Sequence, residues 1–286
     1  MPLHEIGLAS PAGETYITQM TQSRDQWFET SINLLSDPQN QRVWSVIISL
    51  FGDMAQRPND KISGAALTRI ITPMGIKPEA IRVALHRLRK DGWIESVRAG
   101  RASTHYLTQY GRDQCTAVTS RIYARDPILP QELHVLIAAG GFGQEALDEM
   151  LLLPGYIAIN RTTALGYGPR PKTPHDLLAL EADNYSLPNW LKTQLFPADL
   201  SKSCTELFNV TNTISDPPSG LSSAQVASIR TLIVHRWRRV VLRHPDLPAD
   251  FHPPTWPGVA CRDKVFALLD QLPLPNLAEL REPVEA

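Results

Sequence analysis

The stretch "GIKPEAIRVALHRLRKDGWIESVRAGRASTHYLT", residues 75–108, decides the fold of the first half of the chain. Proline is well tolerated at the first position of a helix, and Pro78 is followed by apolar residues at helical spacing as far as Gly92. Residues 93–108 are typical of two strands joined by a turn, which we place at Ala99–Gly100. The stretch therefore predicts a helix followed by a β-hairpin.

The predicted helix has one apolar side and one basic side. On a helical wheel the core residues share one face: Ile81, Ala84, Leu85 and Leu88. The opposite side carries Arg82, His86 and Lys90, with Arg87 and Arg89 beside them. Residues 76–112 hold eight Lys or Arg against three Asp or Glu, whereas the whole chain has a net charge of −1. Positive charge is therefore concentrated on one helix and one hairpin.

Three further helices are predicted before this stretch. "SRDQWFETSINLL" (23–35) opens with a possible capping box, Ser23 to Gln26. "NQRVWSVIISLFGDMA" (40–55) forms the second helix, and a third starts at Ser63 as N-cap and stops near Pro73. Helix, helix, turn, helix and hairpin is the order of a winged helix-turn-helix.

A basic helix followed by a basic hairpin predicts contacts with double-stranded DNA. The planar fork of arginine can hold a phosphate or the edge of a guanine through two hydrogen bonds. We expect Arg82, Arg87 and His86 to line the major groove, and Lys77, Arg98 and Arg101 to hold the backbone or minor groove. The full predicted set is Lys77, Arg82, His86, Arg87, Lys90, Arg98, Arg101 and Thr104. The alternative is a solvated helix face without a partner.

The second half of the chain opens with a β-α-β pattern, "ELHVLIAAGGFGQEALDEML" (132–151) followed by "YIAIN" (156–160). Gly141, Gly143 and Ala146 fit the G-x-G-x-x-A form of the dinucleotide fingerprint. A nicotinamide-dependent oxidoreductase is therefore one hypothesis. It needs further parallel strands, and the sequence after residue 165 predicts none. We prefer a tight strand-to-helix turn that binds no dinucleotide.

The pattern as a whole predicts an α+β protein. We expect an N-terminal extension with a helix (1–33), a winged-helix DNA-binding domain (34–121), an α+β middle domain (122–200) and a helical C-terminal domain (201–286) whose main helix covers residues 222–243. No G-x-S-x-G or H-E-x-x-H motif is present, so we predict no catalytic residues, no metal site and no cofactor. Three scattered cysteines and the lack of a signal peptide or apolar span favour the cytoplasm.

Three segments resemble one known family, the phenylacetate-catabolism repressors or PaaX-type regulators. Residues 75–111 resemble its recognition helix and wing, "SRIYA" (120–124) its post-wing stretch, and "LIVHRWRRVVLRHPDLPADFHPPTWPG" (232–258) its C-terminal signature. The resemblance implies a bacterial homodimer with a winged helix, a ferredoxin-like middle domain and a helical C-terminal domain. It also implies a repressor of an aromatic-acid catabolic operon, released from operator DNA by a coenzyme A thioester such as phenylacetyl-CoA.

A thioester of this class carries phosphates and an aromatic or acyl tail, so its site should pair arginines with an apolar slot. The candidate residues outside the DNA-binding domain are Tyr156, Arg161, Tyr167, Arg170, Arg236, Trp237 and Arg239. The family commonly has an acidic residue where Arg236 stands. A winged helix that contacts another protein instead of DNA is the second alternative function.

Overall fold

The computed structural model describes residues 11–100, 102–126, 132–153, 155–170, 172, 174–183, 185–243 and 247–280. The chain divides into two compact units. The first comprises the described residues of Met1–Thr119, Val210–Arg236 and Lys264–Ala286, and the second those of Ser120–Asn209 and Trp237–Asp263. Helices and two sheets confirm the predicted α+β class. The predicted domain boundaries remain a prediction.

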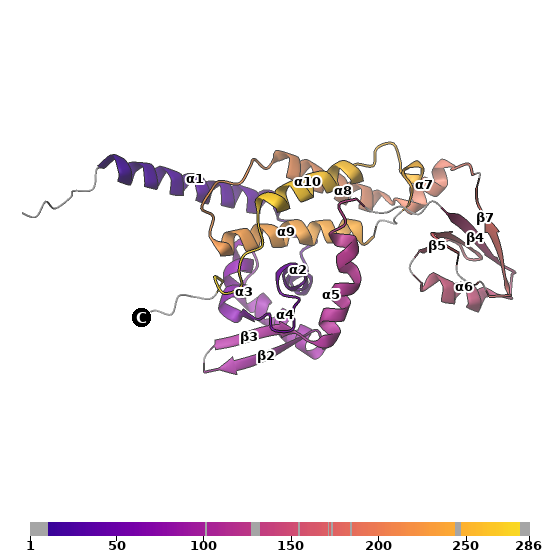
Figure 1. Cartoon of the computed structure of the whole chain (residues 1–286), viewed down its shortest axis with the longest axis horizontal. Coiled ribbons are helices and arrows are strands. Elements are labelled where there is room, and N and C mark those ends of the chain that lie inside the picture. The colour runs from indigo at the N-terminus through magenta and orange to yellow at the C-terminus, as the bar shows by residue number, and fades with distance from the viewer. Residues whose placement is uncertain are drawn as a thin grey trace, which may run out of the picture. The chain divides into compact units, whose positions relative to one another are not determined.

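The N-terminal part of the chain follows the predicted order (Figure 1). It consists of α1 (Pro11–Leu35), α2 (Val43–Met54), β1 (Ile62–Ser63), α3 (Gly64–Ile71), the 3-10 turn η1 (Thr72–Met74), α4 (Pro78–Lys90), β2 (Ile94–Ala99), β3 (Ala102–Leu107) and α5 (Gln109–Ile122). The Ser63 side chain accepts a hydrogen bond from the Ala66 amide at 3.1 Å, so the predicted N-cap is confirmed. Pro78 takes the predicted place in the first turn of α4.

The predicted start of the first helix is wrong. Ser23 lies inside α1, which begins at Pro11. Residues 14–22 contain neither glycine nor proline, so nothing in them stops a helix. Proline can open a helix because its missing N–H is not needed in the first turn.

The apolar side of α4 is confirmed as core. Its four predicted residues are all buried: Ile81, Ala84, Leu85 and Leu88. Helix α4 packs against α2, whose residues Val46, Leu50 and Phe51 are also buried. The basic side of α4 is thereby left on the surface.

The first sheet has the order β1-β3-β2, with antiparallel neighbours. Ala99 pairs with Ala102, so the chain reverses after Ala99, one residue later than predicted. Gly100 has a φ of +60°, which favours glycine. Because side chains alternate along a strand, Ser96 and Arg98 share a face with Ser103 and His105.

The second unit contains β4 (Leu133–Ala138), α6 (Gln144–Leu151), β5 (Tyr156–Asn160), β6 (Thr163–Tyr167), β7 (Leu177–Glu181) and α7 (Asn189–Leu195). The predicted β-α-β unit is confirmed as β4-α6-β5, while β6 and β7 are strands that the sequence analysis does not predict. The strand order is β5-β6-β4-β7, and every neighbouring pair is antiparallel. One face packs on α6 and the other on α7.

The glycine-rich turn connects β4 to α6. Gly143 has a φ of +74°, and a Cβ at this position would collide with the carbonyl oxygen of Asp176. A dinucleotide fingerprint needs a parallel β-α-β crossover in a parallel sheet. The sheet that contains β4 is antiparallel throughout its four strands, so the glycines are explained by the tight turn.

The C-terminal segment contains α8 (Ala198–Thr213), α9 (Ser223–Val241), the 3-10 turn η2 (Ala249–Phe251) and α10 (Gly258–Gln271). The predicted main helix is confirmed as α9. Trp237 is only 2% exposed, and its Nε1 donates to the Ile122 carbonyl at 2.8 Å, as expected for a core residue.

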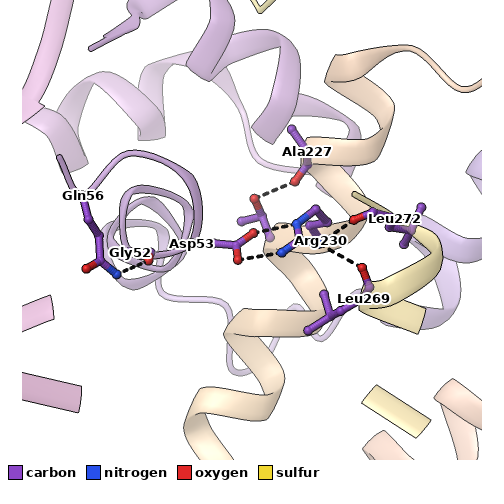
Figure 2. Close-up of polar contacts among 8 residues, drawn as sticks. Gly52, Asp53, Gln56, Ala227, Arg230, Leu269 and Leu272 are labelled. Atoms are coloured by element: carbon purple, nitrogen blue, oxygen red, sulfur yellow. Dashed lines mark hydrogen bonds and ion pairs between the residues drawn. The ribbon is translucent and has the colours of Figure 1, made fainter. Parts of the chain in front are cut away.

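A buried ion pair joins α2 and α9 within the first unit (Figure 2). The Arg230 guanidinium donates to both carboxylate oxygens of Asp53, each at 2.9 Å, and the two side chains are 6% and 0% exposed. The same guanidinium donates to the carbonyls of Leu269 and Leu272 at the end of α10, at 3.1 and 2.5 Å. Arg230 therefore links three helices through one planar group.

The three cysteines are buried thiols. In the part of the chain that the structure describes, no group of His, Cys, Asp and Glu side chains could hold a metal ion. A search of the same residues finds no helix with the length and apolar character needed to cross a membrane.

Candidate nucleic-acid interface

The outer side of α4 presents the predicted DNA-contacting residues to solvent. Arg82, His86 and Lys90 are exposed, and so is Lys77 at the N-cap. Arg82 lies 3.6 Å from Glu79 in an exposed i,i+3 pair, which contributes little because water screens it. The structure therefore leaves these donors accessible.

Arg87 lies apart from Arg82 on the helix. Its Nε is 3.4 Å from an Asp91 carboxylate oxygen, and its guanidinium lies 5.7 Å from the centre of the Trp44 ring. Five residues along a helix correspond to about 140° of rotation. The structure thus places Arg87 beside α2 and does not bring it together with Arg82.

A cleft of about 370 Å³ lies between the start of α3, the side of α4 and the β2–β3 hairpin. Figure 1 shows these elements next to one another. The charged residues that line the cleft are all arginines, namely Arg82, Arg89 and Arg98. Hydroxyl groups come from Thr68, Ser96 and Ser103, and the remaining lining is Gly64, Ala65, Ile81, Leu85 and His105. We call this space the arginine cleft.

His105 forms part of the wall of the arginine cleft and is 6% exposed. Its Nδ1 lies 2.7 Å from the Ser96 hydroxyl and its Nε2 3.2 Å from the Ser103 hydroxyl. Burial, with a smaller contribution from the positive charge of Arg89, lowers the pKa of His105 to about 4. The ring is therefore neutral at neutral pH, and it donates to one hydroxyl and accepts from the other.

We expect His105 to make the fold sensitive to mild acid. Its pKa is about 4 in the folded chain and about 6.5 in an unfolded one, so the unfolded chain takes up the proton first as pH falls. The contribution of neutral His105 to the stability of the fold is therefore fully present above pH 6.5 and is lost as pH falls towards 4. Between pH 7.5 and 5 the parent should lose about 2 kcal/mol more of its free energy of unfolding than His105→Asn. Urea denaturation at both pH values measures the difference, and equal losses would show that His105 is not held neutral.

Two members of the predicted set stand outside the arginine cleft. Thr104 pairs with Val97 and therefore points to the other face of the hairpin. Arg101 lies outside the described residues. Of the predicted residues, the structure brings Arg82 and Arg98 together in the arginine cleft.

The sequence analysis does not assign Arg89, Ser103 or His105 to a site. Arg89 follows Arg82 by seven residues, which is about two helical turns, so the two fall on the same side of α4. Ser103 is the cross-strand partner of Arg98. The sequence could have indicated both residues. The helical period relates Arg89 to Arg82, and pairing across the predicted hairpin relates Ser103 to Arg98.

The candidate effector residues of the middle segment do not form one group. Tyr156 packs on the sheet face that α6 covers, and its hydroxyl lies 2.9 Å from Nε2 of His134. Tyr167 packs on the opposite face. Arg170 lies 3.8 Å from Glu181, and Arg161 is exposed after the end of β5.

The three candidates on α9 have different surroundings. Arg236 belongs to the first unit, is 8% exposed and donates to the carbonyls of Leu34 and Leu35, both at 3.4 Å. These carbonyls end α1, where a cation complements the helix dipole. Trp237 and Arg239 belong to the second unit, and Trp237 is buried while Arg239 is half-buried.

Comparison with known proteins identifies the family of this chain. Residues 42–111 match the family model described as PaaX-like protein, and residues 201–274 match that of the PaaX-like protein C-terminal domain. A curated relative, the transcriptional repressor PaaX of Escherichia coli, is 24% identical over 264 residues, and the match covers 84% of this chain and 84% of the relative. A solved structure of an uncharacterized Mycobacterium tuberculosis protein is similar over 79% of this chain and 95% of its own, with 18% identity and a TM-score of 0.46. Since the two family models cover both the segment with the arginine cleft and the C-terminal helices, the chain belongs to the PaaX-like family.

Proposed function

We propose that this chain is a DNA-binding transcriptional repressor of an aromatic-acid catabolic operon and that a coenzyme A thioester releases it from its operator. The observation that carries the proposal is the arginine cleft beside the exposed basic side of α4, inside the segment that the family model matches. The curated relative is named as a transcriptional repressor. The family is one of regulators and not of enzymes, so the oxidoreductase hypothesis is set aside.

The first unit acts in this proposal as a winged helix. The order α2-β1-α3-α4-β2-β3, with an antiparallel β1-β3-β2 sheet, supports it. Helix α4 enters the major groove with Arg82 and His86, and Arg87 contacts the same groove from the side near α2. Lys77, Lys90, Arg98, Arg101 and Thr104 hold the backbone or the minor groove. Two copies bind two half-sites, as symmetric operators require.

The middle segment acts as a ferredoxin-like domain. The strand order β5-β6-β4-β7 is the order of a β-α-β-β-α-β unit. Among the described residues between Tyr167 and Leu177 there is no helix that would correspond to the second helix of that unit. The proposed domains are residues 34–121, 122–200 and 201–286, after an extension of residues 1–33.

The effector proposal rests on the family and on the chemistry of a catabolic signal. A thioester reports that the acid has entered the cell and has been activated. Arginines near apolar surface suit its phosphates and its acyl tail. We keep Tyr156, Arg161, Tyr167, Arg170, Arg236, Trp237 and Arg239 as candidate residues, although Tyr156 and Tyr167 pack on opposite faces of the sheet.

DNA from the promoter regions next to the gene tests the proposal in a binding titration. We expect the parent to bind one of these fragments more tightly than unrelated DNA. Arg82→Ala should relax this base preference and cost about 1–3 kcal/mol per half-site. If the parent binds every fragment like unrelated DNA, or binds none, then the winged helix contacts another protein or the basic side is only solvated.

The same titration with phenylacetyl-CoA, other acyl-CoA thioesters and free phenylacetate tests the effector class. A ligand can release DNA only if it binds the free form more tightly than the DNA-bound form. DNA must then weaken ligand binding by the same factor. If a free acid releases the DNA and no thioester does, the proposed effector class is wrong.

A further inference from the structure

The arginine cleft holds positive charge that the proposed base contacts do not use. Arg89 on α4 and Arg98 on β2 line it, and no described carboxylate lies within ion-pair distance of either. Arg82 also lines the cleft, where its pair with Glu79 is exposed. Guanidinium groups that share a recess repel one another, so an anion between them lowers the free energy of the arrangement.

The wall of the cleft formed by Gly64 and Ser103 has little free space. A Cβ on Gly64 would lie 2.7 Å from the Ser103 hydroxyl oxygen, so a larger residue at this position would displace that hydroxyl. The Ser103 hydroxyl is held by His105, whose other ring nitrogen is held by Ser96. These contacts hold a hydroxyl group in a recess whose charged lining consists of three arginines.

We propose that the arginine cleft seats one backbone phosphate of bound DNA, with Arg89 and Arg98 as its cationic ligands and Ser103 as a hydroxyl donor. The inference rests on the proposed DNA binding and adds Arg89 and Ser103 to it. A phosphate accepts several hydrogen bonds at once, and arginine forks fit its oxygens in pairs. The start of α3 borders the cleft and adds the positive end of a helix dipole.

If the arginine cleft binds a phosphate, Arg89 and His105 should have different roles. Contacts to phosphate position the protein but read no sequence, whereas contacts to base edges do. Arg89 should therefore strengthen binding to all DNA alike. His105 touches no DNA in this arrangement and is a positioning residue for Ser103.

The DNA arm of the test compares the parent with Arg89→Ala and with Lys202→Ala, which removes an exposed charge on α8. Each lost phosphate contact should make the slope of log affinity against log salt less steep by about 0.9, so a dimer that loses one contact in each half-site should change by about 1.8. We expect this change for Arg89→Ala with operator and with unrelated DNA, and no change for Lys202→Ala. An unchanged slope, or a loss confined to operator DNA, would show that Arg89 does not hold a phosphate.

The anion arm needs no DNA and separates this inference from the proposed function. Inorganic pyrophosphate should raise the melting temperature of the parent and not that of Arg89→Ala. Arg98→Ala provides a second variant in case Arg89→Ala does not fold. If pyrophosphate shifts parent and variants equally, or shifts none of them, the cleft is not an anion seat. A parent that responds to pyrophosphate but binds no DNA would contradict the proposed function and leave the anion site in place.

Discussion

Replacing Arg230 with methionine should lower the free energy of unfolding by about 3–5 kcal/mol, because it removes the guanidinium that bonds both oxygens of the buried Asp53 carboxylate. The loss of stability comes from the Asp53 carboxylate, which stays buried in the variant. Asp53 has a side chain that is 0% exposed and both oxygens bonded to Arg230. The Leu272 carbonyl also loses the hydrogen bond that it accepts from Arg230. Urea denaturation followed by circular dichroism measures the loss.

A double variant shows whether the lost stability comes from the buried Asp53 charge or from the loss of the ion pair itself. Arg230→Met together with Asp53→Leu removes both charges, and apolar replacement of a buried pair is often close to neutral. It should therefore be more stable than Arg230→Met alone. Glu79→Gln, which breaks the exposed pair with Arg82, should leave stability nearly unchanged. A double variant as unstable as the single one would place the cost in the lost bonds to the α10 carbonyls. An Arg230→Met variant as stable as the parent would contradict the expected cost of the buried Asp53 charge.

The ion pair also shows where sequence reasoning ended. Asp53 and Arg230 are 177 residues apart, and neither residue type is expected in a core. Helix α4 was predictable because its apolar period and Pro78 are local signals. Strand β7 was missed because "LLALE" is short and follows a run of prolines. Its pairing with β4 is a tertiary contact that no local pattern encodes.

The candidate site also has a part that local sequence patterns predict and a part that depends on tertiary contacts. The exposed side of α4 followed from its helical period, so Arg82, His86 and Lys90 were found. The arginine cleft depends on how α3 and the hairpin approach α4, which the sequence does not express. Arg236 is a second example. This candidate effector residue bonds to the carbonyls that end α1, some 200 residues earlier in the chain, and no local pattern predicts that contact.

Raising the salt concentration from 50 to 200 mM should weaken operator binding by about 10³–10⁵-fold. DNA carries condensed counterions, and each phosphate that the protein neutralises releases some of them. A homodimer with about 6–10 phosphate contacts would give this steep dependence. The whole chain cannot supply the effect through its total charge, which is −1, so the charge must come from the local excess on α4 and the hairpin.

Fluorescence anisotropy at several salt concentrations measures the slope for operator and for unrelated DNA. Unrelated DNA should show a similar slope at much weaker affinity, because phosphate contacts dominate both modes of binding. A slope near zero with tight operator binding would mean that few phosphates are neutralised, contrary to an interface built on Arg89, Arg98 and the exposed side of α4. A steep slope with equal affinity for all DNA would leave the electrostatic interface intact and would contradict operator recognition by Arg82.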